Sequence, residues 1–168
     1  MLAPQNVNKS FSIPNIFFYD TEIGTISIKE IDGKIINLNF SNFRPDRIDV
    51  QIKESEVLKE AIAELKAYFK GKLRAFSLPL APHGTEFQLR VWKALCDIPY
   101  GKTASYKEIA EAVNNPKAYR AVGNANNKNP ISIIIPCHRV ITSNGKLAGY
   151  GGGIHIKAKL LKIERLNS

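Results

Sequence analysis

The sequence predicts an α/β protein in two parts: a small N-terminal α/β domain of a hairpin and a helix, then a mostly helical C-terminal domain. Three observations carry this prediction. Apolar and polar residues alternate in the first half, two helix capping boxes stand in the second half, and a proline-containing stretch, Leu78–Pro82, separates them. A length of 168 residues suits two small domains. We therefore divide the chain into residues 1–80 and 81–168.

The first half, residues 1–80, is predicted to form a hairpin followed by a helix. Residues 1–15 are expected to be a loose terminus. Polar and apolar residues alternate along parts of Ile23–Phe40, and Asp32-Gly33 between them suits a tight turn. Four apolar residues then recur at helical spacing before Gly71, namely Leu58, Ile62, Leu65 and Phe69. This half contains no cysteine and no histidine, so we interpret it as a scaffold domain.

The second half, residues 81–168, opens with explicit helix-start signals. Thr85–Gln88 and Ser105–Glu108 are capping boxes, and Asn115 followed by Pro116 suits the N-cap and first position of a third helix. Two short helices joined by a tight turn predict a helix-turn-helix. Its last helix is expected to present a face of small residues, Ala118, Ala121, Val122 and Ala125. Packing between helices is an alternative explanation of that face.

A wing and a closing helix complete the second half. Val140-Ile141 and Lys146-Leu147 flank Ser143-Asn144-Gly145, which predicts a hairpin that would serve as a wing. Residues 156–166 are basic and amphipathic and predict a final helix. Trp92 borders the apolar stripe of the first helix and is predicted to lie in the core. We therefore expect a winged helix-turn-helix domain.

The formal net charge of +9 is concentrated in the second half. Residues 1–80 hold 11 Lys and Arg against 10 Asp and Glu, whereas residues 81–168 hold 13 against 5. A basic half-chain is the usual footprint of a polyanionic partner, although a solubilising excess of surface charge is the alternative. No apolar run approaches the ~20 residues that span a bilayer, and no signal peptide is evident, so no membrane partner is expected.

The two cysteines, Cys96 and Cys137, do not make a disulfide scaffold. Cys96 lies on an apolar helix and is predicted to be inert. Cys137 stands in the run Ile135-Pro136-Cys137-His138-Arg139-Val140, where basic neighbours could favour the reactive thiolate. A buried, inert cysteine at the end of an apolar strand explains the same residues. A reactive Cys137 needs a reducing compartment, so we expect a cytoplasmic protein, associated with the nucleoid if the source is prokaryotic.

The run around Cys137 resembles the active-site segment of the O6-alkylguanine-DNA alkyltransferases, also called methylated-DNA–protein-cysteine methyltransferases. Other segments resemble further landmarks of that family and stand in the same order, over about the last half of the chain. They are Phe87–Leu95, Pro99–Gly101, Ser105-Tyr106, Asn115–Ala118, Arg120–Gly123, Asn129-Pro130, Tyr150, Gly152-Gly153, Lys157 and Glu164. The resemblance implies a ribonuclease H-like first domain and a winged helix-turn-helix second domain.

The resemblance also implies the reaction: a direct, irreversible transfer of an alkyl group from O6-alkylguanine in DNA to the protein's own cysteine. O4-alkylthymine is a second candidate substrate. Cys137 would be the nucleophile and methyl acceptor, His138 a base acting through a bound water, and Glu164 the group that orients His138. Each molecule would act once.

The remaining site residues are likewise expected from the resemblance. Tyr106 would donate a proton towards guanine N3, Lys157 would assist Tyr106, and Asn129 would hold the active-site turn. The guanine pocket would be formed by Val140, Tyr150, Gly151 and the backbone of Cys137. No cofactor is expected. No metal is expected either, since neither cysteine nor histidine precedes His83.

Double-stranded DNA is the expected partner, bound through the minor groove with little sequence preference. The target base would be flipped out, with Arg120 entering the stack in its place. Ala118 and Ala121 would permit close approach, Tyr106 would also touch DNA, and three residues would contact the backbone: Lys107, Asn115 and Ser143. A monomer is expected, with cooperative binding along DNA left open.

Two alternative functions are considered for the same sequence. A winged-helix sensor of alkylated DNA would bind without transferring the group, and the presence of Cys137 argues against it. A cysteine hydrolase using Cys137 and His138 would turn over small esters or peptides, and it leaves the basic half-chain unexplained. Ser132 stands where some relatives have a proline lining the alkyl pocket, which bears on the size of group accepted.

Overall fold

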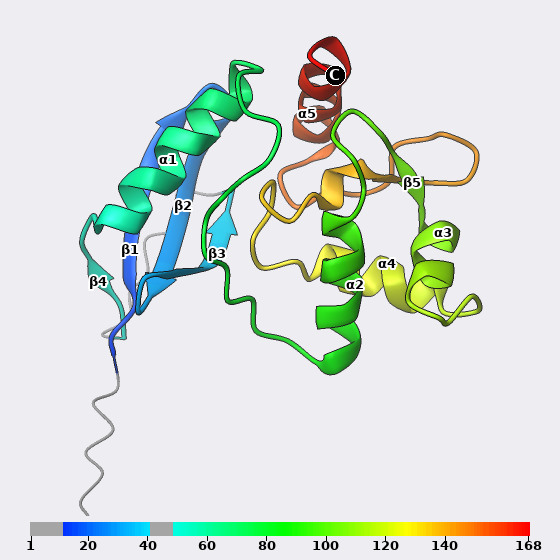
Figure 1. Cartoon of the computed structure of the whole chain (residues 1–168), viewed down its shortest axis with the longest axis horizontal. Coiled ribbons are helices and arrows are strands. Elements are labelled where there is room, and N and C mark those ends of the chain that lie inside the picture. Colours follow the sequence, from blue (N-terminus) through cyan, green and yellow to red (C-terminus); the bar gives the residue numbers. More distant parts are fainter. Residues whose placement is uncertain (1–11, 41–48) are drawn as a thin grey trace, which may run out of the picture.

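The computed structural model describes residues 12–40 and 49–168. Most of the terminus expected to be loose, residues 1–15, lies outside them. The first part is a four-stranded sheet covered on one face by a helix (Figure 1). Its elements are β1 (Asn15–Thr21), β2 (Gly24–Ile31), β3 (Lys34–Asn39), β4 (Gln51–Ile52) and α1 (Glu56–Phe69).

The predicted hairpin is β2–β3, which pair antiparallel around a turn at Asp32 and Gly33. Both turn residues have positive φ, 49° and 74°, the geometry that an Asp-Gly pair tolerates. The strand order is β3-β2-β1-β4. β1 was not predicted, because its buried residues, Ile16 and Tyr19, are three apart and break the alternation of a half-buried strand.

The second part consists of short helices and a two-stranded ladder. Its elements are α2 (Glu86–Cys96), β5 (Ala104–Ser105), α3 (Tyr106–Ala112), α4 (Tyr119–Asn127), the 3-10 turn η1 (Cys137–Arg139), β6 (Val140–Ile141) and α5 (Ile154–Leu166). Both predicted capping boxes are present, at the starts of α2 and α3. Trp92 is buried as predicted, and its indole N–H donates to the Ala125 carbonyl at 2.8 Å, which ties α2 to α4.

Three local predictions in the second part were wrong. α4 begins at Tyr119 rather than Pro116, because Asn114 adopts a left-handed conformation and Ala118 N–H closes a turn onto the Asn115 carbonyl. The predicted face of small residues is divided: Val122 and Ala125 are buried, whereas Ala121 is exposed.

The wing is a loop rather than a hairpin. Thr142 N–H donates to the Lys146 carbonyl and Gly145 N–H to the Thr142 carbonyl, but no strand follows. Instead β6 pairs parallel with β5, at the start of α3. The alternative that placed Cys137 at the end of an apolar strand is also contradicted, because Cys137 begins the turn η1.

The edge strand β3 joins the two parts. Ile35 N–H donates to the Pro79 carbonyl, Ala81 N–H returns to the Ile35 carbonyl, and Leu38 N–H donates to the Pro130 carbonyl, each at 2.8 Å. The linker and the segment leading to Cys137 therefore both bond to the edge of the N-terminal sheet. Buried apolar residues from both parts form one continuous core.

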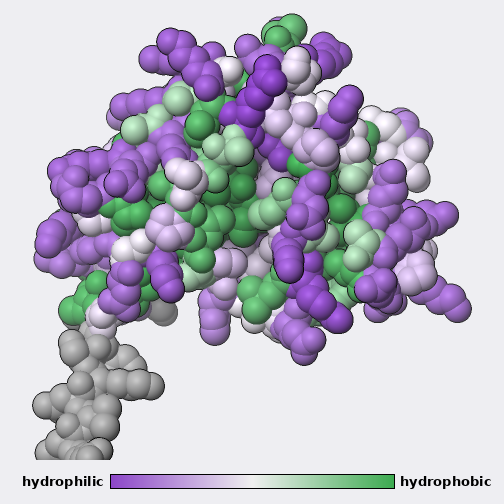
Figure 2. All heavy atoms as spheres, in the orientation of Figure 1, coloured by the Kyte–Doolittle hydropathy of each residue, from purple (hydrophilic) through white to green (hydrophobic). Residues whose placement is uncertain are grey.

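Figure 2 shows hydrophilic side chains around much of the rim of the viewed face, with apolar atoms showing between them. In the part of the chain that the structure describes, no helix has the length and apolar character needed to cross a membrane.

Candidate active site

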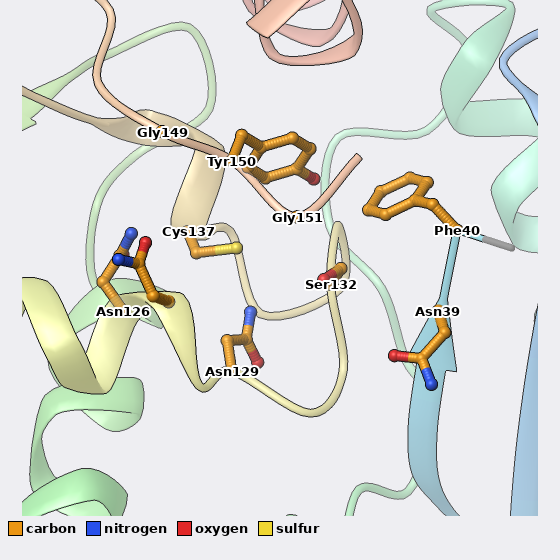
Figure 3. Close-up of a pocket in the computed structure, with 10 residues that line it drawn as sticks. Asn39, Phe40, Asn126, Asn129, Ser132, Cys137, Gly149, Tyr150 and Gly151 are labelled. Atoms are coloured by element: carbon orange, nitrogen blue, oxygen red, sulfur yellow. The ribbon is translucent and has the colours of Figure 1, made fainter. Parts of the chain in front are cut away.

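Cys137 lies at the wall of a cavity of about 230 Å³ and is only 4 % exposed. Its sulfur points into the space between the loop at Tyr150 and the turn at Asn129 (Figure 3). The cavity is lined from both parts of the chain, by Asn39, Phe40, Asn126, Asn127, Asn129, Ser132, Cys137, Gly149, Tyr150 and Gly151. It is therefore large enough for a planar ligand to approach the thiol.

A tight turn before Cys137 is held by the side chain of Asn129. Its amide donates to the Ile135 carbonyl at 2.8 Å, and its carbonyl oxygen accepts from Ile131 N–H at 3.0 Å. Ile133 within this turn has a φ of 73°, a conformation that is strained for a β-branched residue. Such strain persists only where the surroundings hold it, and here the Asn129 amide closes the turn.

Behind Cys137, His138 and Glu164 form a fully buried pair. His138 Nε2 lies 2.8 Å from Glu164 Oε1, while Arg139 donates to both oxygens of the same carboxylate. Gly101 N–H donates to Oε2 at 3.0 Å. Burial alone would raise the pKa of Glu164, but the hydrogen bonds from His138 and Arg139 outweigh it and hold that pKa at about 2. Glu164 is therefore an anion at neutral pH.

The other nitrogen of His138 is open. Nδ1 is buried and has no hydrogen-bond partner among the residues that the structure describes. Burial lowers the pKa of His138, against the opposing effect of Glu164. The imidazole is therefore neutral near pH 7, with one nitrogen committed to Glu164 and the other able to accept a proton.

Lys157 lies beneath the cysteine and is also fully buried. Its ammonium group donates to the carbonyls of Val140 (2.5 Å) and Ala148 (3.3 Å). Among the described residues, no hydrogen bond joins Lys157 to its predicted partner, Tyr106. Burial raises the pKa of the Cys137 thiol, whereas the Asn129 hydrogen bond and the Lys157 charge act in the opposite direction.

Tyr106 is the first residue of α3 and is half-buried. Burial raises its pKa, and the proximity of Cys137 adds to the effect. The ring lies against α4 at Gly123, where a Cβ atom would come within 3.8 Å of the ring. Tyr106, on α3, therefore lies close to both Cys137 and α4.

The residues expected to contact DNA lie at the surface of the second part. Arg120, Lys107, Asn115 and Ser143 are exposed, and Ala118 is partly exposed. The Arg120 guanidinium lies 5.9 Å from the ring centre of Tyr119, itself 48 % exposed. Lys107 approaches Glu111 at 3.9 Å, a weak surface pair.

Several residues of the site were not expected from the sequence. Tyr68, at the end of α1, bonds to both His138 and Glu164, so the first part is more than a scaffold. Phe40 and Asn39 line the cavity from β3 and the residue after it. Asn126 was not expected either, and its Oδ1, like the hydroxyl of the expected pocket residue Tyr150, is buried without a partner among the described residues. Cys96, expected in an apolar setting, is exposed at the end of α2.

The fold and the site define a class of protein: one with a buried free cysteine at a cavity and an adjacent buried His–Glu pair, in a helical domain of helix-turn-helix type. Comparisons identify the family. Residues 86–166 match the model for the 6-O-methylguanine DNA methyltransferase DNA binding domain, and residues 17–82 match the model for its ribonuclease-like domain.

Individual members of this family are similar to the chain over most of its length. A methylated-DNA–protein-cysteine methyltransferase of Methanosarcina barkeri is 51 % identical over 156 residues, which cover 89 % of this chain and 98 % of the relative. One of Mycobacterium leprae is 47 % identical over 148 residues, with 87 % and 89 % covered. The crystal structure of the Mycobacterium tuberculosis O6-methylguanine methyltransferase superposes with a TM-score of 0.85 at 43 % identity, over 92 % of this chain and 94 % of that one. A structure of Mycobacterium tuberculosis OGT in complex with DNA has the same TM-score.

The chain belongs to the O6-methylguanine-DNA methyltransferase family. It is a DNA-repair methyltransferase that transfers an alkyl group from O6-alkylguanine in DNA to a cysteine of its own.

Proposed function

We propose that Cys137 is the cysteine that accepts the alkyl group. One observation carries the assignment: the Cys137 thiol faces the cavity (Figure 3), and the next residue in the chain, His138, forms a buried pair with Glu164. Cys96 is exposed at the end of α2 and does not line the cavity that Cys137 faces. A soft thiolate suits attack on an alkyl carbon.

In the proposed mechanism the neutral His138 accepts the thiol proton at Nδ1 through a bound water. The Cys137 sulfur then forms a bond to the alkyl carbon as the bond from that carbon to guanine O6 breaks. The electron pair of the broken bond passes into the guanine ring, which takes a proton at N3 from the Tyr106 hydroxyl. Tyr106 regains a proton from solvent, and the protonated His138 releases one to solvent, so the net proton transfer is from the thiol to guanine. Lys157 supports the thiolate through its charge and is also proposed to assist Tyr106.

The flipped guanine is proposed to occupy the cavity at Cys137, against Tyr150 and the backbone of Gly151. The Val140 carbonyl already accepts from Lys157, and a second lone pair remains for the base. The unpartnered Asn126 Oδ1 adds an acceptor for the guanine amino group. Asn129 is proposed to preserve the turn that aims the thiol. Both O6-alkylguanine and O4-alkylthymine carry the required alkyl ether.

DNA is proposed to bind to the exposed surface of α3 and α4, in the minor groove and with little sequence preference. Exposed Ala121 and partly exposed Ala118 permit close approach, and Arg120 fills the space left by the flipped base. Lys107, Asn115 and Ser143 would contact phosphates, so affinity should fall steeply with salt. The protein is proposed to bind DNA as a monomer.

The reaction as proposed needs neither cofactor nor metal, and it consumes the protein because a thioether does not hydrolyse under mild conditions. Cys137 must stay reduced before it meets its substrate, which favours a reducing compartment such as the cytoplasm.

The test is the intact mass of the protein after mixing with excess duplex that contains one O6-methylguanine, followed by peptide mapping. We expect a stoichiometric gain of one methyl group on Cys137. Cys137→Ala should abolish the gain and preserve DNA binding, while the matched variant Cys96→Ser should react like the wild type. An unchanged wild-type mass despite tight binding would overturn the proposal and favour a sensor.

A further inference from the structure

Tyr68 lies directly behind the His138–Glu164 pair, although it belongs to the sheet-and-helix part of the chain. We propose that Tyr68 is a positioning residue of the transfer reaction, which holds His138 with Nδ1 free to accept the proton. This inference rests on the proposed function of Cys137 and His138. It assigns a role in the chemistry to a side chain 69 residues before the cysteine.

The contacts of the Tyr68 hydroxyl are short and buried. The hydroxyl donates to Glu164 Oε1 at 2.7 Å and lies 3.2 Å from His138 Nε2. Tyr68 has no exposed surface, and neither do His138 and Glu164. The three groups therefore form a closed triangle from which water is excluded.

Counting protons fixes the direction of each hydrogen bond. Glu164 is an anion and can only accept, so the single proton of the Tyr68 hydroxyl is directed to it. The phenol oxygen then faces His138 Nε2 with its lone pairs. Nε2 thus meets two acceptors, Glu164 Oε1 and the Tyr68 oxygen, and both favour a proton on Nε2.

The opposite tautomer would be costly in this setting. With the proton on Nδ1, Nε2 would place a lone pair against a carboxylate oxygen at 2.8 Å. The buried Nδ1–H would also have no protein partner among the described residues. Tyr68 and Glu164 together therefore hold the tautomer in which Nδ1 is the free base.

The ring of Tyr68 is fixed from three sides, so the position of its hydroxyl is defined. Ring centres lie 5.8 Å from Phe69, 5.3 Å from Phe76 and 6.1 Å from Tyr100, the last edge-on at 90°. Packing of this kind leaves a side chain one rotamer. The end of α1 thus serves as a rigid support for His138.

Tyr68 acts through His138 and does not itself touch the reacting atoms. It is absent from the residues that line the cavity at Cys137. Burial, followed by the charge of Glu164, raises the pKa of the Tyr68 phenol well above its usual range, so the group keeps its proton. The charged and titratable groups around His138 are Tyr68, Cys137, Arg139, Tyr150, Lys157 and Glu164.

The experiment compares Tyr68→Phe with Tyr19→Phe. The control removes an equivalent hydroxyl from the same part of the chain, since buried Tyr19 donates to Glu54 at 2.9 Å, far in sequence from His138. We would measure the rate of transfer from free O6-benzylguanine and from methylated duplex between pH 5.5 and 9, together with duplex affinity. Nitrogen-15 NMR of labelled histidine would report the His138 tautomer.

For Tyr68→Phe we expect a transfer rate roughly three- to tenfold lower on both substrates, as for one lost hydrogen bond, with duplex affinity unchanged. Its pH–rate profile should be displaced from that of the wild type, whereas Tyr19→Phe should overlay the wild type. In wild-type protein, NMR should show the proton on Nε2 and none on Nδ1.

Two results would overturn the inference while leaving the proposed function intact. The first is a wild-type rate and pH profile for Tyr68→Phe. The second is a wild-type NMR spectrum with the proton on Nδ1, which needs no variant to fold. A wild-type protein that transfers no alkyl group would instead refute the proposed function, and the tautomer measurement would still stand by itself.

Discussion

Two charged regions of this molecule differ in how their charges are compensated. The Glu164 cluster, formed by Tyr68, His138, Arg139 and Glu164, is buried and supplies its own partners. The α3–α4 surface, with Lys107 and Arg120, is exposed and holds its charges in water. The charges of the first are paired within the protein, whereas those of the second, the proposed DNA surface, would be paired by phosphates.

The two regions also differ in energetics, because one is buried and the other is exposed to water. A buried carboxylate is tolerable only when donors surround it, and Glu164 receives them from Tyr68, His138, Arg139 and Gly101. Within the cluster, His138 Nδ1 is the exception, because it is buried and unpartnered among the described residues. This unpartnered nitrogen is the atom that we propose accepts the proton of the Cys137 thiol.

The largest expected effect comes from breaking the buried cluster. Glu164→Gln preserves shape but removes the charge that balances Arg139, so we expect about 3–5 kcal/mol less stability to unfolding by urea. The matched control is Glu111→Gln, which breaks the exposed 3.9 Å pair with Lys107 and should cost less than about 1 kcal/mol. Equal losses for the two variants would contradict the contrast drawn between the regions.

Low pH should reduce the stability to unfolding that the Glu164 cluster gives the wild-type protein. The pKa of Glu164 is lowered from 4.5 to about 2 on folding, which corresponds to about 3 kcal/mol of stability at neutral pH. Because the folded-state pKa is the lower one, this stability is complete above about pH 5 and is lost as the pH falls towards 2. Urea unfolding at a series of pH values would measure it, and Glu164→Gln should show a shallower decline.

Removing the Arg120 side chain should slow transfer from duplex DNA but not transfer from a free base. Arg120→Ala leaves the buried cluster intact, so stability should change by less than about 0.5 kcal/mol. Transfer from a duplex should slow roughly tenfold or more, since nothing then replaces the flipped base, while transfer from free O6-benzylguanine should be unchanged. Arg90→Ala is the control, an exposed arginine 6.0 Å from the ring of Phe87. Equal slowing on both substrates would place Arg120 in the chemistry instead.

Sequence reasoning succeeded where structure is local. The hairpin at Asp32-Gly33, the helix ending before Gly71 and both capping boxes depend on residues a few positions apart, and all are present. The small face of α4 and the wing were wrong because they depend on distant partners. Strand β6 pairs with β5, more than 30 residues earlier in the chain, and this pairing replaces the local hairpin.

The residues of the candidate site also divide into those that a local sequence pattern indicates and those that only the fold brings together. Cys137 and His138 are adjacent in sequence and stand out by type. Tyr68 does not, because a tyrosine between Leu65 and Phe69 on an amphipathic helix has the pattern of an ordinary core residue. Only the packing of α1 against the second part brings its hydroxyl to Glu164, 96 residues later. No local pattern encodes that contact.

The smallest effect, and the sharpest test of the exposed region, concerns Lys107. If Lys107 meets a phosphate, Lys107→Ala should weaken duplex binding a few-fold for every sequence and reduce the slope of log affinity against log salt by about one. Lys59→Ala is the matched control, because Lys59 is also an exposed helical lysine paired with an acid, Glu56, at 2.8 Å, but on α1. Neither variant should alter stability by more than about 1 kcal/mol, since surface pairs contribute little. An unchanged salt slope in Lys107→Ala would remove Lys107 from the DNA surface and restrict that surface to α4 and the loop after β6.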